Sequence, residues 1–253
     1  MPSHLLVARM RLVILIGFSW SCSTFAADAK DPNSPLKIHI ISGCAEYKSD
    51  DSLKEFQAYL EKNFNVQVTA SWGKDGITQL ENLDALKEAD VLLLFARRMK
   101  LAEEQMAIIR KHWDQGKAVV GVRTACHAFE KADNELFDGK VLGGAYQNHF
   151  GDGPVKVTTT EKGQTHPILK DVKPFVSRKL YKEGELAADT VVLQEGDNGM
   201  LKQPVSFVHT YHNGRVFFTS LGVQEDFQDE NFRRMLVNGL FWTANRDVEL
   251  AKK

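Results

Sequence analysis

The sequence predicts an α/β fold: a mainly parallel sheet flanked by helices, flavodoxin-like or Rossmann-like in its first half, with antiparallel strands added in its second half. Three observations predict it. Apolar segments of strand length alternate with segments of helical periodicity up to residue 122, which implies right-handed crossovers between parallel strands. Later strands follow one another through turns rather than through long helices. A last amphipathic helix ends the domain.

The first half supplies the parallel part of the sheet. Four strands are predicted there, at 36–43, 66–70, 89–95 and 118–122. Three helices fall between them, at 53–64, 82–89 and 102–113. Asp50, Asp51 or Ser52 can cap the first helix, and Gly116 can end the third. The last two strands are continuously apolar, as expected for strands buried on both faces.

The second half has a different pattern. Four further strands are predicted, at 155–159, 190–193, 205–209 and 215–219. Asn213-Gly214 is a hairpin signal, and His166-Pro167 predicts a turn in which His166 is structural. A final helix is expected over roughly 229–245, and the tail from Glu249 to Lys253 is expected to fray.

The N-terminus has the order of a Sec-type signal peptide over residues 1–26. Arg9 and Arg11 precede the apolar run 12–18, small residues follow, and no acidic residue occurs before Asp28. The apolar run is shorter than the about 20 residues of a membrane span, so we expect no stable membrane anchor after signal removal. A retained anchor and a lipoprotein signal ending at Cys22 are the lesser alternatives. Cleavage near Ala26, with Ala29 as second choice, would give an exported protein that is periplasmic or secreted.

Residues 27–35 then form a polar lead that we expect to be disordered, followed by a single domain over 36–247. The chain is 43% hydrophobic and 26% charged, with a net charge of −1, and this balance excludes a generally basic nucleic-acid binder. No nucleic-acid partner is expected. Only Cys44 and Cys126 follow the signal peptide, and the sequence leaves open whether they pair. The oligomeric state also stays open.

Polar side chains gather in loops that follow three of the predicted parallel strands. Ligands of such sheets bind outside the carboxyl ends of the strands, so these loops should form one edge and one site. Glu46 and Tyr47 follow the first strand, and Arg97 and Arg98 follow the third. The arginines can bind carboxylate or carbonyl oxygens, and Glu46 is a candidate for proton transfer.

The segment 121–129 has the order of a strand, a tight turn and a helix. Elbows of this kind expose their turn residue, which we expect to be Arg123 rather than Cys126. Cys126 would lie in the first helical turn, where N–H groups lower a thiol pKa. His127 is its neighbour, but adjacent residues on a helix face different directions. A buried packing role for Cys126 therefore outweighs catalysis.

Two more loops supply candidates. In the Gly-rich segment 142–153, Tyr146 can stack on a sugar-like ligand and His149 can bind or transfer a proton, with a purely structural loop as the equal alternative. Its glycines do not form a phosphate-binding motif. Glu225 follows a late strand and can reach the same site, or it can merely place negative charge near the N-terminus of the last helix, as Asp226 can.

We expect no cofactor and no protein-held metal. The alternative is a divalent metal such as zinc, bound where His209, Tyr211 and His212 could join His149, since neutral imidazoles are good zinc ligands. No pair of these histidines has the helical spacing of a zinc motif, and no Cys-x-x-Cys supports them.

Several strings occur in an order and spacing that match one family. They are Ser42-Gly43 with Glu46-Tyr47-Lys48-Ser49, Arg97-Arg98, residues 120–129 (VGVRTACHAF), Leu142-Gly143-Gly144 with His149, His166-Pro167-Ile168, Pro204-Val205 and residues 214–222 (GRVFFTSLG). Together they resemble the ThuA-like (trehalose-utilisation) family. The resemblance implies a class I glutamine amidotransferase-like fold and a connection with sugar metabolism, including disaccharide utilisation and oxidised keto-sugar intermediates. It does not imply glutaminase activity.

At three positions this chain differs from many members of the family that it resembles. Many relatives have His where this chain has Arg123, Ser or Thr where it has Cys126, and His where it has Val223. These departures resemble a secreted branch of the family, and they argue against a His-based or metal-based mechanism.

The sequence thus predicts an exported protein that acts on or binds a small carbohydrate or sugar derivative at the carboxyl edge of its sheet. The expected catalytic residues are Glu46, Arg123 and His149. The expected substrate-binding residues are Tyr47, Arg97, Arg98, Cys126, His127, Tyr146 and Glu225. One alternative is a non-catalytic module that binds a glycan or an acidic ligand, and another is a thiol-dependent hydrolase that uses Cys126.

Overall fold

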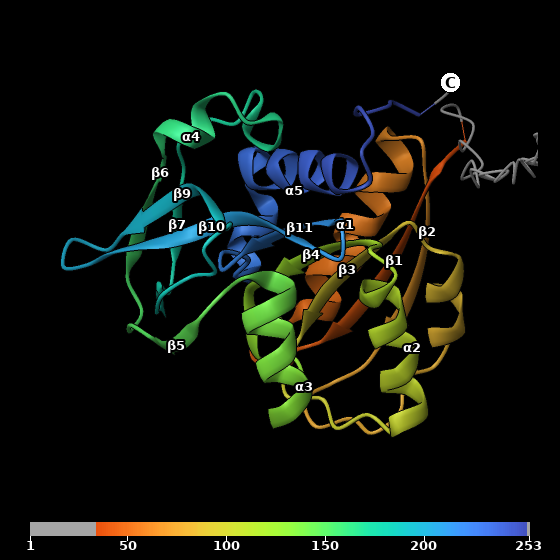
Figure 1. The fold of residues 1–253 in the computed structure, drawn as a ribbon. Coiled ribbons are helices and arrows are strands. Elements are labelled where there is room, and N and C mark those ends of the chain that lie inside the picture. The colour runs from red at the N-terminus through yellow and green to blue at the C-terminus, as the bar shows by residue number, and fades with distance from the viewer. Residues whose placement is uncertain (1–33, 252–253) are drawn as a thin grey trace, which may run out of the picture. The chain divides into compact units, whose positions relative to one another are not determined.

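The computed structural model describes residues 34–251, and the signal peptide expected over 1–26 and most of the lead over 27–35 lie outside these residues. Five parallel strands form one half of the main sheet: β1 (Leu36–Gly43), β2 (Val66–Trp72), β3 (Val91–Ala96), β4 (Ala118–Val122) and β11 (Gly214–Thr219). Their spatial order is β2-β1-β3-β4-β11 (Figure 1). Strand order therefore reverses beside β1, which is where ligands bind in sheets of this kind.

Antiparallel strands extend the sheet beyond β11. They are β10 (Lys202–Tyr211), β9 (Val191–Asp197), β6 (Pro154–Thr159) and β7 (Val176–Arg178). A separate antiparallel ribbon pairs β5 (Tyr146–His149) with β8 (Tyr181–Glu183). The predicted change from parallel to antiparallel strands is confirmed, but the ribbon was not expected.

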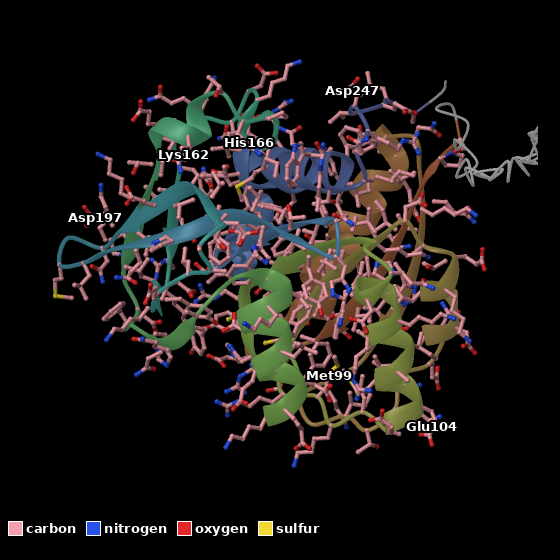
Figure 2. All side chains as sticks on the ribbon, viewed as in Figure 1. Met99, Glu104, Lys162, His166, Asp197 and Asp247 are labelled. Atoms are coloured by element: carbon pink, nitrogen blue, oxygen red, sulfur yellow. The ribbon has the colours of Figure 1, made fainter. Side chains whose placement is uncertain are left out.

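Helices cover both faces of the sheet. On one face α1 (Ser49–Asn63) and α5 (Glu230–Thr243) pack their apolar residues into one core cluster. On the other, η1 (Leu83–Glu88), α2 (Glu103–Asp114) and the π-helix η3 (Phe137–Leu142) enclose a second cluster. Short helices complete the connections: η2 (Arg123–His127), α3 (Lys131–Leu136), α4 (Glu161–Gln164), η4 (Pro167–Leu169) and η5 (Gln224–Gln228). Figure 2 shows the side chains on these layers.

Local sequence signals explain several of the connections. His212 and Asn213 both have left-handed backbone angles, with φ values of 46° and 67°, as the primed turn of a tight hairpin requires. Gly116 has a φ of 68°, and a Cβ atom there would lie 2.3 Å from the carbonyl oxygen of His212, so only glycine fits after α2. The Nδ1 atom of His166 accepts a hydrogen bond from the backbone of Ile168, which agrees with the structural role predicted for His166.

Two local predictions were wrong. The first helix begins at Ser49, after Lys48 in a left-handed conformation, and none of the expected residues caps it. The Ser49 hydroxyl instead accepts a hydrogen bond from the backbone of Cys44, because the loop after β1 folds back onto the start of α1. The tail does not fray at Glu249: its carbonyl accepts from the backbone of Asn65, and Ala251 donates to Asn63. Long-range pairing with the end of α1 holds this segment.

Candidate functional site

The turn after β4 forms the centre of the site. Arg123 is its first residue and has a φ of 52°, which confirms it as the turn residue of the elbow. Contrary to expectation, its side chain is not exposed but fully buried. Its guanidinium donates to the Ser220 carbonyl and, over 3.2 Å, to the Tyr47 hydroxyl, so the elbow is tied to the loops after β11 and β1.

Aromatic rings surround this buried cation. The guanidinium carbon lies 4.6 Å from the ring centroid of Tyr47 and 4.0 Å from that of Tyr181. The Tyr146 ring lies 4.8 Å from the Tyr181 ring and stacks on His127 at 4.6 Å. We call these five residues the elbow cluster. Because no carboxylate pairs with Arg123 within the described chain, the two ring faces and two neutral oxygens stabilise its charge.

His127 is neutral at physiological pH. Burial, together with the positive charges of Arg97, Arg98 and Arg123, lowers its pKa to about 3. The three arginines of the predicted edge therefore do gather around one imidazole. The backbone of Arg98 also donates to the His127 carbonyl at 2.9 Å, which fixes the loop after β3 against the elbow.

Cys126 is not an activated thiol. It is buried, and burial raises its pKa well above the ordinary value, so the expected lowering by a helix N-terminus does not occur. The expectation that the side chains of Cys126 and His127 diverge was also wrong: the Cys126 sulfur lies 3.3 Å from the Nδ1 atom of His127. Both Cys126 and Cys44 are free thiols.

A polar cleft of about 290 Å³ opens beside the elbow cluster. Tyr47 separates it from Arg123, and the cleft is otherwise lined chiefly by three acidic and three basic side chains. They are Glu46, Asp152, Glu225, Lys48, Arg178 and Lys179. We call this hollow the edge cleft. It lies beside the loop after β1, where the reversal of strand order predicts ligand binding.

Ion pairs order part of this edge. The Nε atom of Arg97 lies 3.4 Å from a carboxylate oxygen of Glu46, and its Nη1 atom donates to Asp75 at 2.7 Å. Lys179 lies 3.2 Å from Asp152 and 5.2 Å from the Tyr47 ring centroid. Arg98, by contrast, is exposed and forms no ion pair within the described residues. Its guanidinium is therefore available to an acidic group of a ligand.

The structure distributes the predicted residues over two adjoining places. Glu46, Tyr47 and Glu225 line the edge cleft, whereas Arg123, His127 and Tyr146 join Tyr47 in the elbow cluster. Arg97 adjoins the cleft through Glu46, and Cys126 adjoins the cluster through His127, but exposed Arg98 belongs to neither place. His149 also lies outside both: it is exposed on β5, and no side-chain contact joins it to another candidate within the described chain.

Two buried acids next to the elbow cluster were missed. Asp138 accepts a hydrogen bond from the backbone of Tyr146 at 3.0 Å, and Glu183 accepts one from Ala145 at 3.2 Å. Burial raises the pKa of Asp138 to about 6 and that of Glu183 to about 8. The alternation of buried Tyr181 and Glu183 around exposed Lys182 is the strand signal that could have located the second acid.

Asp226 has a larger role than the sequence suggested. Its carboxylate accepts hydrogen bonds from the backbones of Gly222 and Val223 and from the Ser177 hydroxyl. Burial raises its pKa to about 6. Asp226 therefore shapes the loop from which Glu225 enters the edge cleft.

The histidines considered as zinc ligands have different hydrogen-bond partners. His209 is buried and bonds to the Lys140 carbonyl, while exposed His212 bonds to the Asp114 carbonyl. Residues 34–251 contain no group of three or more His, Cys, Asp or Glu side chains placed to hold a metal ion. In the same part of the chain, no helix is long and apolar enough to cross a membrane.

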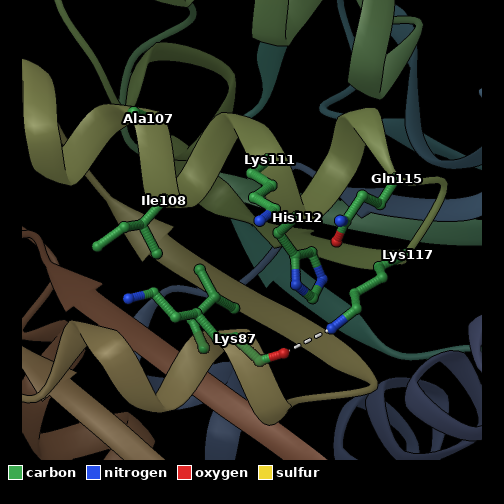
Figure 3. Close-up of a pocket in the computed structure, with 8 residues that line it drawn as sticks. Lys87, Ala107, Ile108, Lys111, His112, Gln115 and Lys117 are labelled. Carbon is green, nitrogen blue, oxygen red and sulfur yellow. Dashed lines mark hydrogen bonds between the residues drawn. The ribbon is translucent and has the colours of Figure 1, made fainter.

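A second hollow, of about 360 Å³, lies between η1 and α2 (Figure 3). Apolar Leu86 and Ile108 line it together with buried His112, and Lys117 closes one side by donating to the Lys87 carbonyl at 2.8 Å. None of the residues predicted for the site lines this hollow. We therefore place the candidate site at the edge cleft and the elbow cluster.

Comparisons with known proteins agree with this architecture. The family profile described as ThuA, trehalose utilisation, matches residues 37–243. No curated protein has a significantly similar sequence. A ThuA-like protein from Parabacteroides merdae is similar in structure, with a TM-score of 0.64 and 17% identity over 87% of this chain and 93% of that chain.

Two further structures are similar. A ThuA-like protein from Bacteroides uniformis has a TM-score of 0.62 and 16% identity, covering 85% of this chain and 94% of that chain. A protein from Salmonella typhimurium described as cytoplasmic has a TM-score of 0.58 and 12% identity, covering 85% of this chain and 99% of that chain. The predicted glutamine amidotransferase-like fold is thus confirmed, and because the profile spans most of its length, the chain belongs to the ThuA (trehalose utilisation) family.

Proposed function

We propose that this protein is exported and that it binds, and acts on, a carbohydrate or sugar derivative in the edge cleft, without glutaminase activity. One observation carries the proposal: three acidic and three basic side chains surround the phenol of Tyr47 in one small hollow at the carboxyl edge of the sheet. A polyhydroxylated ligand needs donors and acceptors on every side, and this lining supplies both. The volume lies near the lower end of ligand pockets, about 300 Å³, and suits a single sugar ring.

The residues divide by chemistry. Glu46 and Glu225 accept hydrogen bonds from ligand hydroxyls, and Lys179 donates to ligand oxygens. Arg98 is exposed and does not line the edge cleft, so it can bind only a carboxylate or carbonyl group of an oxidised sugar that extends beyond the cleft. Arg123 is buried behind Tyr47, so its proposed role is to hold that phenol rather than to touch the ligand.

Proton transfer is assigned to Glu46, with His149 as the second candidate. Glu46 lines the edge cleft, and the Nε atom of Arg97 lies 3.4 Å from its carboxylate, which orients this group toward the cleft as a candidate base. His149 is exposed on β5 and would have to approach the ligand from the ribbon. Tyr146 and His127 provide a stacked aromatic surface beside the same edge.

The alternatives predict different observations. A thiol-dependent hydrolase would need an accessible thiolate, whereas Cys126 is buried with a raised pKa, and this argues against that alternative. A non-catalytic module remains the second candidate, because the elbow carries Arg123 where a nucleophile would stand. Saturable binding without any product would favour the module.

The experiment measures ligand affinity and product formation over a panel of trehalose, other disaccharides, keto-sugars and sugar acids. Glu225→Gln and Lys179→Met change the edge cleft, and each should weaken binding of the active panel member at least about tenfold, as expected for the loss of one charge-assisted hydrogen bond. Lys100→Met is the matched control, since Lys100 pairs with Glu130 on the surface. Unchanged affinity in both cleft variants would place the ligand elsewhere.

Export needs its own test. Expression of the full chain with its natural N-terminus should yield a periplasmic or secreted product whose first residue is Ala27. A product that stays in the cytoplasm at full mass would contradict the proposed signal peptide.

A further inference from the structure

Two buried carboxyl groups hold the strand that carries Tyr146. The Oδ2 atom of Asp138 accepts the backbone N–H of Tyr146, and the Oε2 atom of Glu183 accepts the N–H of the preceding residue, Ala145. The acids come from different elements, η3 and β8, so together they fasten the start of β5 from two sides. Both side chains are less than a tenth exposed.

Each acid also has an oxygen without a partner. The Oδ1 atom of Asp138 and the Oε1 atom of Glu183 are buried and form no hydrogen bond. Within the described chain the two carboxyls accept only backbone N–H groups, and no lysine or arginine compensates their charge. Two buried carboxylates near each other without a counter-ion cost free energy, and this cost falls when one of them is protonated.

Two glycines, Gly143 and Gly144, make room in the backbone beside these acids. A Cβ atom at Gly144 would lie 2.6 Å from the Oδ1 atom of Asp138, and Gly143 has a φ of 69° with the His209 ring 2.6 Å from the place of its Cβ. The two glycines therefore allow the chain to pass directly over the Asp138 carboxyl. This passage leads the π-helix η3 into β5, and π-helical turns often mark functional positions.

Within the described residues, no lysine or arginine is among the groups that interact with this pair. From η2 it faces the thiol of Cys126, from β5 the phenol of Tyr146, and each carboxyl faces the other. From β10 the side chain of Gln203 accepts the backbone N–H of Glu183. The nearby His209 bonds through Nε2 to the Lys140 carbonyl, and its Nδ1 atom lies 3.2 Å from a carboxylate oxygen of Asp189.

We propose that Asp138 and Glu183 act as a latch that positions Tyr146: while at least one of the two carboxyls is protonated, the β5–β8 ribbon stays closed over the elbow, and when both are ionised the ribbon opens. Closure keeps Tyr146 stacked on His127 and Tyr181 against Arg123. Opening would expose the elbow to ligand. The latch thus regulates the candidate site of the proposed function, but its test needs no ligand.

The sign of the pH effect follows from the raised pKa values. Burial and the neighbouring Asp138 raise the Glu183 pKa from 4.5 to about 8, so the closed ribbon binds a proton that an opened one releases. The free energy that ionisation of Glu183 costs the closed ribbon is absent below about pH 4.5. It grows as pH rises and is complete above about pH 8. Asp138 has the same effect at lower pH, because its pKa is raised from 3.8 to about 6.

Hydrogen exchange of the Ala145 and Tyr146 amides in the full mature protein tests the latch. After correction for intrinsic exchange, their protection should fall at least about tenfold between pH 6 and pH 9. Glu183→Gln keeps an oxygen for Ala145 but cannot ionise, so its protection should stay nearly constant. Glu185→Gln is the matched control, exposed on the same segment, and should behave as wild type. The amide of Leu169, bonded to His166, is the internal reference.

Protection that is flat with pH in the wild type, or that falls equally in Glu183→Gln, would overturn the latch. If Glu183→Gln does not fold, Asp138→Asn supplies a second comparison: it removes the charge that helps to raise the Glu183 pKa, so protection should fall less with pH and the fall should be complete at a lower pH than in the wild type. Failure of this test would leave sugar binding in the edge cleft unaffected. Conversely, absence of sugar binding would not alter the exchange result.

Discussion

Replacement of Tyr47 by phenylalanine tests how the elbow is held. The change removes one oxygen atom and keeps the ring that lies 4.6 Å from the Arg123 guanidinium. Arg123 is fully buried, its Nε atom already has no hydrogen-bond partner, and its Nη2 atom donates to the Tyr47 hydroxyl at 3.2 Å. Tyr47→Phe therefore leaves a second N–H of a buried cation without an acceptor.

The expected loss is about 1.5 to 3 kcal/mol of unfolding free energy, the usual cost when a buried charged group loses a hydrogen-bond partner. With an m-value of about 2 kcal/mol per M, the urea midpoint should fall by about 1 M while m stays constant. Urea unfolding followed by fluorescence and by circular dichroism measures this change. Coincident transitions would establish two-state behaviour.

Tyr59→Phe is the matched control. Tyr59 stacks on Phe56 in α1, and its hydroxyl forms no hydrogen bond within the described chain. Its replacement should change the free energy of unfolding by less than about 0.5 kcal/mol. If Tyr47→Phe changes stability as little as this control, the buried guanidinium does not depend on Tyr47, and the reasoning about the elbow cluster is refuted.

Three further predictions follow from the same geometry. Gly144→Ala should destabilise the protein by about 1 to 3 kcal/mol in urea unfolding, because its Cβ would meet the Asp138 carboxylate at 2.6 Å, and an unchanged midpoint would show that the loop can move aside. Neither Cys126 nor Cys44 should react with iodoacetamide at pH 7 until urea unfolds the chain, and mass spectrometry of the native protein would detect any labelling that contradicts their burial. Burial lowers the pKa of His39 from 6.5 to about 4, so stability should fall as pH drops through this interval, and His39→Gln should make the urea midpoint less sensitive to acid than in the wild type.

The parallel half of the fold could be predicted because its signals are local. Continuous apolar runs marked β3 and β4, and helical periodicity marked α1 and α2. The ribbon of β5 and β8 could not be predicted, since each strand has four residues or fewer and its partner lies far along the chain. Such short strands gain their stability from pairing rather than from their own composition.

The candidate site divides in the same way. Strand order places Glu46, Tyr47 and Arg97 at one edge, and the loops that carry them were predicted to meet there. The buried acids Asp138 and Glu183 were missed, because acidic residues usually indicate exposed positions and only tertiary contacts show that these two are enclosed. His149 was chosen for its chemistry, but its strand leaves it exposed.

The sequence by itself determined the alternation of strands and helices, the family and the edge at which polar loops meet, since these depend on periodicity and on motifs along the chain. Only the tertiary structure decided the state of each group: that Arg123 is enclosed by tyrosines, that Cys126 is an unactivated thiol and that two acids hold Tyr146. Burial and the identity of neighbouring charges set the energy of an ionisable side chain, and both are properties of the packed molecule rather than of the residue.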